Sequence, residues 1–325
     1  MDNLNFILRP YKGAGDNAAL SAIAHEATGE PFTPEKVAYE LNGPGLNHSR
    51  DTVVCELHDG RVIGYACIWI DDVKDIRQGR LHCRIGAQSP EPSQTAREIL
   101  LWAARRMQVE LDTTNRPVAI VELVKEADMV RREFLEDAGF QAIRYYHIMR
   151  LKDPDALAEL PLPDGHNYLH GPGHEGAPEY VAMFNDTWID HYGFIPLSVE
   201  EFIHDIDDDP DYNATLDIVV KRSDGHFVGF AFCRLEQMDA TLGEVMAIGI
   251  RRGFRGIGLG RVLLTHAVRT LVEHGATEIE LSVDSENPSG AGRLYESVGF
   301  RAISVSRRYQ LSQDGVIRLA TLDAC

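Results

Sequence analysis

Two hydrophobic periodicities run through the chain, and the same order of elements occurs twice. Apolar residues that alternate or run together over short stretches predict strands, whereas apolar residues three and four positions apart predict amphipathic helices. Each half is expected to have a helix, three strands, a long helix, a fourth strand, a short helix and a last strand. The opening helix and first four strands are predicted at 18–28, 52–57, 62–70, 80–86 and 117–124 in one half, and at 178–190, 216–221, 227–235, 243–250 and 277–283 in the other. This order predicts an α/β fold with a mixed sheet in each half.

The two halves also share two short motifs, which indicates an internal repeat. Glu136–Ile143 and Glu296–Ile303 both read E-x-x-G-F-x-A-I. Further upstream, Asp59–Ala66 and Asp224–Ala231 both place an Asp-Gly turn before an apolar strand, which is typical of a hairpin. Because both motifs recur at nearly the same offset, we expect two units of one fold.

A proline-rich stretch separates the halves. Asp153–Gly165 contains Pro154, Pro161 and Pro163, and prolines at this density oppose regular structure. We therefore expect a first domain at 1–155, a linker at 156–165 and a second domain at 166–325.

The composition is that of an ordinary globular protein, with 44% hydrophobic and 25% charged residues among 325. No apolar run approaches the roughly 18 residues of a membrane span, and the N-terminus lacks the pattern of a secretory signal. The formal net charge of −18 opposes binding to nucleic acid or to an anionic membrane, although solubility alone also explains it. Five cysteines without a C-x-x-C pair indicate reduced thiols, so we expect a cytoplasmic protein. We expect the protein to be either a monomer or a homodimer.

No metal site is expected. His166, His170 and His174 have the spacing of helical metal ligands, but Gly171-Pro172-Gly173 interrupts any helix there. The acidic run 205–211 lacks the spaced ligands and turn glycine of a calcium loop.

The strongest chemical signal is a glycine-rich loop between a strand and a helix. Gly256, Gly258 and Gly260 follow the predicted strand 243–250, and a helix begins at once. Glycines let backbone N–H groups turn toward a ligand, and a helix start adds free N–H donors, so this arrangement is typical of a phosphate cradle. The Gly-Lys-Ser/Thr of a P-loop is absent, and a tight turn is the alternative explanation. Four arginines surround the loop: Arg251, Arg252, Arg255 and Arg261.

A second motif follows about thirty residues later. Asn287 precedes Leu294-Tyr295 and Gly299-Phe300, while 255–260 reads R-G-x-G-x-G. Together these motifs resemble the GNAT superfamily of acyl-CoA-dependent N-acetyltransferases. A duplicated chain whose second half carries the motifs is similar to tandem acetyltransferases of the mycothiol synthase type. The resemblance implies two tandem GNAT-like domains, each a mixed, mostly antiparallel central sheet flanked by helices, and acetyl-CoA as co-substrate.

The resemblance also implies which residues hold the acyl carrier. The amides of 256–260, with Arg255, would hold the pyrophosphate, and the edge of strand 246–250 would pair with the pantetheine amides. An N–H near Ile248 would face the thioester oxygen. Asn287 would bind the pantetheine arm, or else cap the helix before Pro288. The expected cofactor-binding residues are Ala247, Ile248, Ile250, Arg255, Gly256, Ile257, Gly258, Leu259, Gly260 and Asn287.

Two residues of the second half are expected to be catalytic. Tyr295 is the expected general acid, because a phenol of pKa about 10 can protonate a departing thiolate whose conjugate acid has a pKa of about 8.5. Packing under the Gly-Phe turn is its alternative role. Glu244 is the expected base, because residues two apart on an extended strand share a face, which places it on the side of Ile248. A solvated strand end is the alternative, and Glu236 is the other candidate base.

Aromatic residues ahead of these strands would line the acceptor pocket, with Trp188, His191 and Tyr192 as contacts or as ordinary core. In the first half, Pro92–Arg97 replaces the glycine loop and Leu135 stands in the place of Tyr295, so we expect a degenerate, non-catalytic first domain. The expected function is direct transfer of an acetyl group from acetyl-CoA to a primary amine of a small molecule. Another acyl or aminoacyl transferase and a non-catalytic CoA-binding sensor are the alternatives.

Overall fold

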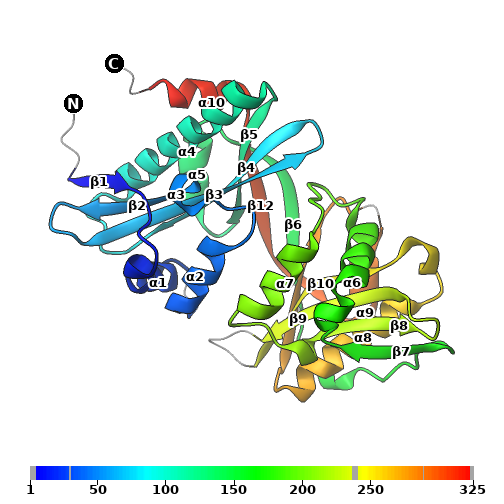
Figure 1. The fold of residues 1–325 in the computed structure, drawn as a ribbon. Coiled ribbons are helices and arrows are strands. Elements are labelled where there is room, and N and C mark those ends of the chain that lie inside the picture. Colours follow the sequence, from blue (N-terminus) through cyan, green and yellow to red (C-terminus); the bar gives the residue numbers. More distant parts are fainter. Residues whose placement is uncertain (1–4, 29–30, 236–240, 288, 323–325) are drawn as a thin grey trace. The chain divides into compact units, whose positions relative to one another are not determined.

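The repeated elements fold into two units, each with its own apolar cores. The computed structural model describes residues 5–28, 31–235, 241–287 and 289–322. The first unit comprises Met1–Ile143 together with Arg307–Cys325, and the second comprises Arg144–Ser306. In Figure 1 the first unit includes the blue and cyan elements and the red helix α10, whereas the labels β7 to β10 mark strands of the second.

The first unit holds strands in the order β1-β2-β3-β4-β5, together with the end of β12 (Arg301–Leu311) from Arg307 onward. The pairs β1/β2, β2/β3 and β3/β4 are antiparallel, and β4/β5 is parallel because a helix crosses between those two strands. The elements from the N-terminus are β1 (Phe6–Arg9), α1 (Ala14–Thr28), α2 (Pro34–Asn42), α3 (His48–Asp51), β2 (Thr52–Leu57), β3 (Val62–Val73), β4 (Ile76–Ile85), α4 (Pro92–Thr114), β5 (Val118–Lys125), α5 (Met129–Asp137) and β6 (Gln141–Leu151).

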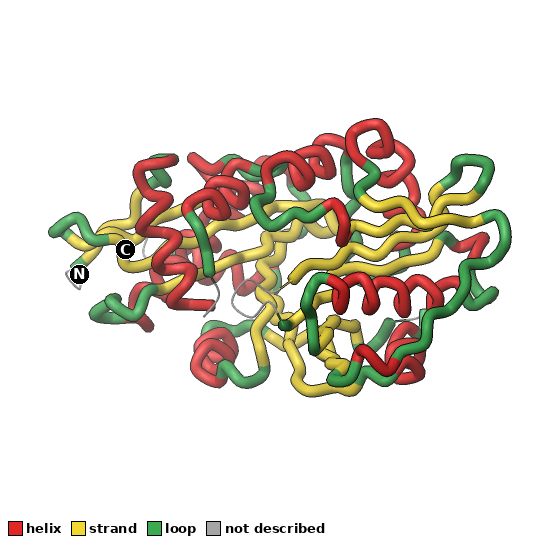
Figure 2. Tube along the Cα trace, turned by 90° about the horizontal axis from the view of Figure 1, so that it is seen from below, coloured by secondary structure: helices red, strands yellow, loops and turns green. Residues whose placement is uncertain are grey.

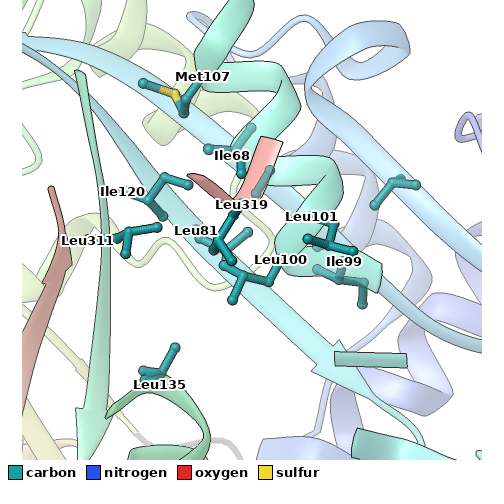
Figure 3. Packing of buried hydrophobic residues seen from close by; sticks show 14 of the residues in the cluster. Ile68, Leu81, Ile99, Leu100, Leu101, Met107, Ile120, Leu135, Leu311 and Leu319 are labelled. Carbon is teal, nitrogen blue, oxygen red and sulfur yellow. The ribbon is translucent and has the colours of Figure 1, made fainter. Parts of the chain in front are cut away.

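Helices cover both faces of this sheet, because its strand residues alternate between two apolar clusters. Cys55 of β2 belongs to the cluster that contains α4, and the neighbouring Val54 belongs to the cluster that contains α1 and α2. Figure 3 shows the first cluster, where Ile99 and Met107 of α4 lie among side chains from the strands. Leu311 and Leu319, from the far end of the chain, lie in the same cluster.

The second unit repeats this plan with strands in the order β6-β11-β10-β9-β8-β7, together with the start of β12 up to Ser306. Only β10/β11 is parallel; β6/β11, β10/β9, β9/β8 and β8/β7 are antiparallel. The mixed, mostly antiparallel α/β fold expected from the sequence is therefore confirmed. The remaining elements are η1 (Pro154–Ala156), β7 (His166–His170), α6 (Gly173–Trp188), α7 (Val199–Asp208), η2 (Ala214–Leu216), β8 (Asp217–Arg222), β9 (Phe227–Leu235), β10 (Leu242–Ile250), η3 (Arg252–Phe254), α8 (Leu259–Glu273), β11 (Glu278–Asp284), α9 (Ala291–Val298), β12 (Arg301–Leu311) and α10 (Gln313–Ala320).

Helices lie on both sides of the strands in the second unit as well (Figure 2). Val245 of β10 belongs to the cluster that contains α8, whereas Ala247 packs against the cluster that contains α6. The face of β10 that meets α8 and the face that meets α6 are thus separate surfaces.

The division into units differs from the one expected from the prolines. Residues 157–163 have no regular secondary structure, as the prolines predicted, but Leu157 and Leu162 pack against the core of the second unit. The expected linker 156–165 therefore lies within that unit. Arg307–Cys325 belongs to the first unit instead of the second, because Tyr309, Leu311 and Val316 are buried in the first unit's core. The boundaries fall in β6 and β12.

Candidate active site

A cavity of about 340 Å³ opens in the second unit where β10 and β11 separate. The two strands pair only from Leu242 to Val245 of β10, opposite Glu278 to Leu281 of β11. Beyond that point both strands line the cavity, together with residues of α6, of the loop after it and of α9. A second cavity, of about 310 Å³, shares His191, Asn287 and Ser289 with the first and adds Arg255.

The backbone of β10 turns hydrogen-bonding groups toward the side of this cavity. The N–H of Arg251 donates to the carbonyl oxygen of Val228 on β9 at 2.9 Å. Backbone groups of an antiparallel strand point alternately toward and away from one neighbour, so Gly249 and Ala247 also face β9. The N–H groups of Ile248 and Ile250 therefore point to the side of the cavity, and Ile248 lines it.

The glycine loop has the form of an anion cradle. Gly256 and Gly258 have φ values of +82° and +85°, and Gly258 is the N-cap of the 15-residue helix α8. A Cβ at either glycine would meet no atom within 4 Å, so these glycines serve the backbone conformation and leave the loop's surface open. Among the described residues, the five amides of 256–260 have no hydrogen-bond acceptor. Free amides at the positive end of a helix dipole suit a phosphate ligand.

The arginines around the loop hold it in place. Arg255, expected to contact the pyrophosphate, donates from Nε to the carbonyl oxygen of Ile250 at 2.8 Å and from Nη2 to that of Thr187 at 3.0 Å. Arg251 pairs with Glu179 at 2.9 Å, and Arg252 pairs with Asp190 at 2.6 Å. These contacts tie the loop to α6 and the residues just after it.

Tyr295 lies at the inner wall of the cavity. Its side chain is 7% exposed and packs edge-on against Phe300, with ring centroids 6.2 Å apart. This contact agrees with the packing role, while its place in the cavity lining also allows a chemical one. Burial raises the pKa of the Tyr295 phenol to about 12, so the hydroxyl keeps its proton at neutral pH.

Asn287 forms a turn and does not cap the helix. Its Oδ1 accepts the N–H of Ser289 at 2.8 Å, and the N-cap of α9 is Gly290. Asn287 lines both cavities, so its side chain lies beside the space that an extended ligand would cross.

Glu244 lies on the other face of β10 from the one expected. A β-bulge between Val245 and Ala247 interrupts the alternation, and Glu244 pairs across from Arg234 of β9 while Ile248 pairs across from Ala231. Glu244 therefore shares a face with Ala247, on the side of α6, and the face argument that linked it to Ile248 is wrong. Glu244 is half-buried and is not part of the cavity lining. The other candidate base, Glu236, lies outside the described residues.

Trp188, His191 and Tyr192 all line the larger cavity. The rings of Trp188 and His191 stack with centroids 4.1 Å apart, and Trp188 also stacks on Phe184. Trp188 is thus partly core, but all three expected residues line the cavity. Burial, reinforced by Arg255, lowers the pKa of His191, although Asp284 and Asp190 oppose the shift.

Arg144, which no sequence pattern marks, reaches the same site from β6. Arg144 forms an ion pair with Asp284 at 2.9 Å, and Asp284 lines the cavity. No sequence signal joins residues 140 positions apart; only the β6/β11 register, which pairs Tyr146 with Asp284, brings them together.

The first unit keeps the separated strands, but its helix begins without glycines. β4 and β5 pair only from Arg77 to Arg80, opposite Val118 to Val121, and a cavity of about 510 Å³ lies beyond. The helix there begins with Pro92, which has no N–H. Leu135, at the place of Tyr295, is fully buried.

The described residues contain no group of three or more His, Cys, Asp or Glu side chains that could hold a metal ion. None of the helices in the described part of the chain is both long enough and apolar enough to cross a membrane.

Comparison with known proteins identifies a domain in the second unit. Residues 180–300 match the model of the acetyltransferase (GNAT) family, so the chain contains a GNAT acetyltransferase domain. The chain is 37% identical over 86 residues to a mycothiol acetyltransferase of Beutenbergia cavernae, which is 26% of this chain and 29% of that protein. The matched stretch thus spans less than a third of the relative's length.

Two solved structures share the fold of nearly the whole chain. A GCN5-related N-acetyltransferase from Sphaerobacter thermophilus superposes with a TM-score of 0.65 at 20% identity, covering 95% of this chain and 96% of that one. A tandem GNAT protein from the clavulanic acid biosynthesis pathway also has a TM-score of 0.65, at 14% identity, covering 95% and 98%. The tandem GNAT architecture expected from the internal repeat is therefore confirmed at the level of fold.

Proposed function

We propose that this chain, whose second unit carries a GNAT domain, is an acetyl-CoA-dependent N-acetyltransferase that acts on a primary amine of a small molecule. The observation that carries the proposal is the set of five amides at 256–260, at the start of α8, which have no acceptor among the described residues and follow Arg255, a residue of the smaller cavity. These donors suit the diphosphate of coenzyme A, because the glycines leave the surface of the loop open.

The remaining residues have distinct roles in this proposal. The N–H groups of Ile248 and Ile250 pair with the pantetheine amides, and Ile248 donates to the thioester oxygen as charge builds on it. Asn287, beside the same channel, offers its side-chain amide to the pantetheine arm. Arg255 supports the diphosphate indirectly, because its contacts with Ile250 and Thr187 hold the loop.

Acetyl-CoA supplies an acetyl thioester, whose carbonyl carbon forms a bond to the amine nitrogen as its bond to sulfur breaks. Tyr295 donates its proton to the departing sulfur, a role that its raised pKa permits because the phenol is protonated at neutral pH. Glu244 takes the proton that the amine loses, through water, from the α6 side of β10, where Phe184 and Trp188 border the acceptor end. No covalent enzyme intermediate is needed.

The acceptor is expected to be small and cationic, because Trp188, His191 and Tyr192 offer ring faces and the chain has a net charge of −18. The similarity to a mycothiol acetyltransferase makes mycothiol-related amines one class to test. Reduced thiols fit a cytoplasmic reaction, and Cys55, Cys67, Cys83 and Cys233 are all free.

The first unit is proposed to be non-catalytic. Its helix begins with a proline where the second unit has free amides, and a leucine stands in the place of the proposed acid.

Calorimetric titration with acetyl-CoA, followed by turnover assays with a panel of acyl-CoAs and amines, tests the proposal. Saturable acetyl transfer to an amine supports it. Binding without turnover on any amine favours the sensor, preference for a longer acyl or aminoacyl donor favours the other transferase, and no binding of acetyl-CoA refutes the proposal.

A further inference from the structure

One arginine of the second unit contacts both walls of the proposed active site. Arg144, on β6, donates from Nε to both carboxylate oxygens of Asp284, at 3.0 and 2.9 Å, and its Nη1 binds Glu286 at 2.7 Å. Its guanidinium carbon also lies 4.6 Å from the centre of the Tyr192 ring. Three separate segments of the unit thus meet at one side chain.

The carboxylates belong to the turn that carries Asn287. Within this turn, the N–H of Glu286 binds Oδ1 of Asp284 at 3.0 Å, and the N–H of Asn287 binds the Asp284 carbonyl oxygen at 3.1 Å. The Asp284 side chain is 8% exposed and that of Arg144 is 14% exposed, so this pair is shielded from solvent. Glu286 is exposed and adds less.

Tyr192 belongs to the acceptor loop, residues 189–197, which joins α6 to α7 without helix or strand. Asn185 fixes the far end of this loop through two hydrogen bonds of 2.9 Å with Leu197. Near the middle, Tyr192 is held by the Arg144 guanidinium over its ring, an attractive arrangement for a cation.

We propose that Arg144 is a positioning residue that fastens the acceptor loop to the Asp284–Asn287 turn, so that the acceptor wall keeps its place beside the acyl-carrier wall. The inference rests on the proposed function. A guanidinium can hold a carboxylate with two donors and stack on a ring at once, because it is planar and forked; the ammonium of lysine cannot do both.

The chain offers a matched control on the same strand. Arg150 of β6 also pairs with carboxylates of β11, donating from Nε to Glu280 at 2.7 Å and from Nη1 to Glu278 at 2.6 Å. It lines neither cavity of the site. Replacing Arg150 removes the same kind of cross-strand pair without touching the acceptor loop.

The test compares Arg144→Lys and Arg150→Lys in the full chain. For Arg144→Lys we expect KM for the amine to rise about tenfold, while the Kd of acetyl-CoA changes less than about threefold. Arg150→Lys should leave both values unchanged. Tyr192→Leu should reproduce the rise in KM, and the double variant Arg144→Lys/Tyr192→Leu should be no worse than either single one, because both changes break one contact.

Hydrogen exchange separates this inference from the proposed function, because it needs no turnover. Amides of 189–197 should exchange faster in Arg144→Lys than in Arg150→Lys, with the two melting temperatures close together. Unchanged exchange in this loop overturns the positioning role, whether or not an amine is acetylated. Equal kinetic effects of the two arginine variants, or additive effects of the Arg144 and Tyr192 changes, also overturn it.

Discussion

The cradle at the start of α8 leads to a sharp prediction about its glycines. Gly256 and Gly258 have left-handed φ values of +82° and +85°, whereas Gly253, in the same loop, does not lie in that region. A Cβ at any of the three would meet no atom within 4 Å. Replacing each by alanine therefore tests the backbone conformation alone, and Gly253→Ala is the matched control.

The expected loss follows from the strain on the backbone. An alanine held in the left-handed region costs roughly 1 to 2 kcal/mol relative to its preferred conformation. Without ligand, the loop can relax to a conformation that avoids this cost. Binding of acetyl-CoA to the cradle would require the left-handed conformation again, so the cost would appear in the free energy of binding. Gly256→Ala and Gly258→Ala should thus each weaken acetyl-CoA binding about 5- to 30-fold, since about 1.4 kcal/mol corresponds to a factor of ten.

Calorimetric titration with acetyl-CoA, paired with thermal unfolding, measures this loss. Gly253→Ala should bind as the parent chain does, and the melting temperatures should show that all three variants are folded. A folded Gly258→Ala variant that binds acetyl-CoA as tightly as Gly253→Ala would refute the claim that the amides of this turn hold the ligand.

Three further predictions concern single side chains. Tyr295→Phe should lower kcat by about 10²- to 10⁴-fold with the Kd of acetyl-CoA unchanged, because only the proton donor is lost; unchanged kcat in steady-state assays would remove the acid role. Glu244→Gln should lower kcat at neutral pH and recover part of it at high pH, where the amine is already deprotonated. If kcat of the variant and of the parent chain changed with pH in the same way, Glu244 would not be the base. Burial raises the pKa of Asp217 to about 7, so the folded chain binds a proton that the unfolded chain has released between about pH 4 and 7. Its contribution to the free energy of unfolding should fall as pH rises through that range, and denaturant titrations should show a smaller fall for Asp217→Asn.

Local patterns were sufficient for most of the elements. The predicted strands at 52–57 and 227–235 coincide with β2 and β9, because each is a short apolar run bounded by turn residues. β1 and β7 were missed, since both are short and lie at sheet edges, where little apolar pattern is required. α10 was missed as well: it has eight residues, and its fit against the first unit's core is a tertiary property.

Site residues that belong to a short sequence motif could be predicted from the sequence. Those whose position depends on how the strands pair could not. Tyr295 and the aromatic residues Trp188, His191 and Tyr192 line one cavity, and Arg255, next to the glycine loop, lines the cavity that shares residues with it. The face of Glu244 was wrong because a single extra residue at the bulge reverses the alternation, and no residue type marks that bulge in the sequence. No sequence pattern marks Arg144, because its carboxylate partners Asp284 and Glu286 follow 140 and 142 residues later in the chain.

The assignment of Arg307–Cys325 to the first unit has a consequence for biosynthesis. The ribosome releases Met1–Ile143 first, yet the core of that unit lacks Leu311, Val316 and Leu319 until the whole second unit has been made. The second unit, although encoded later, can therefore complete its fold first. Until then the first unit leaves an apolar surface exposed, because part of its core has not yet been synthesised. Nascent chains stalled before residue 311 should depend on chaperones far more than chains that include Leu319.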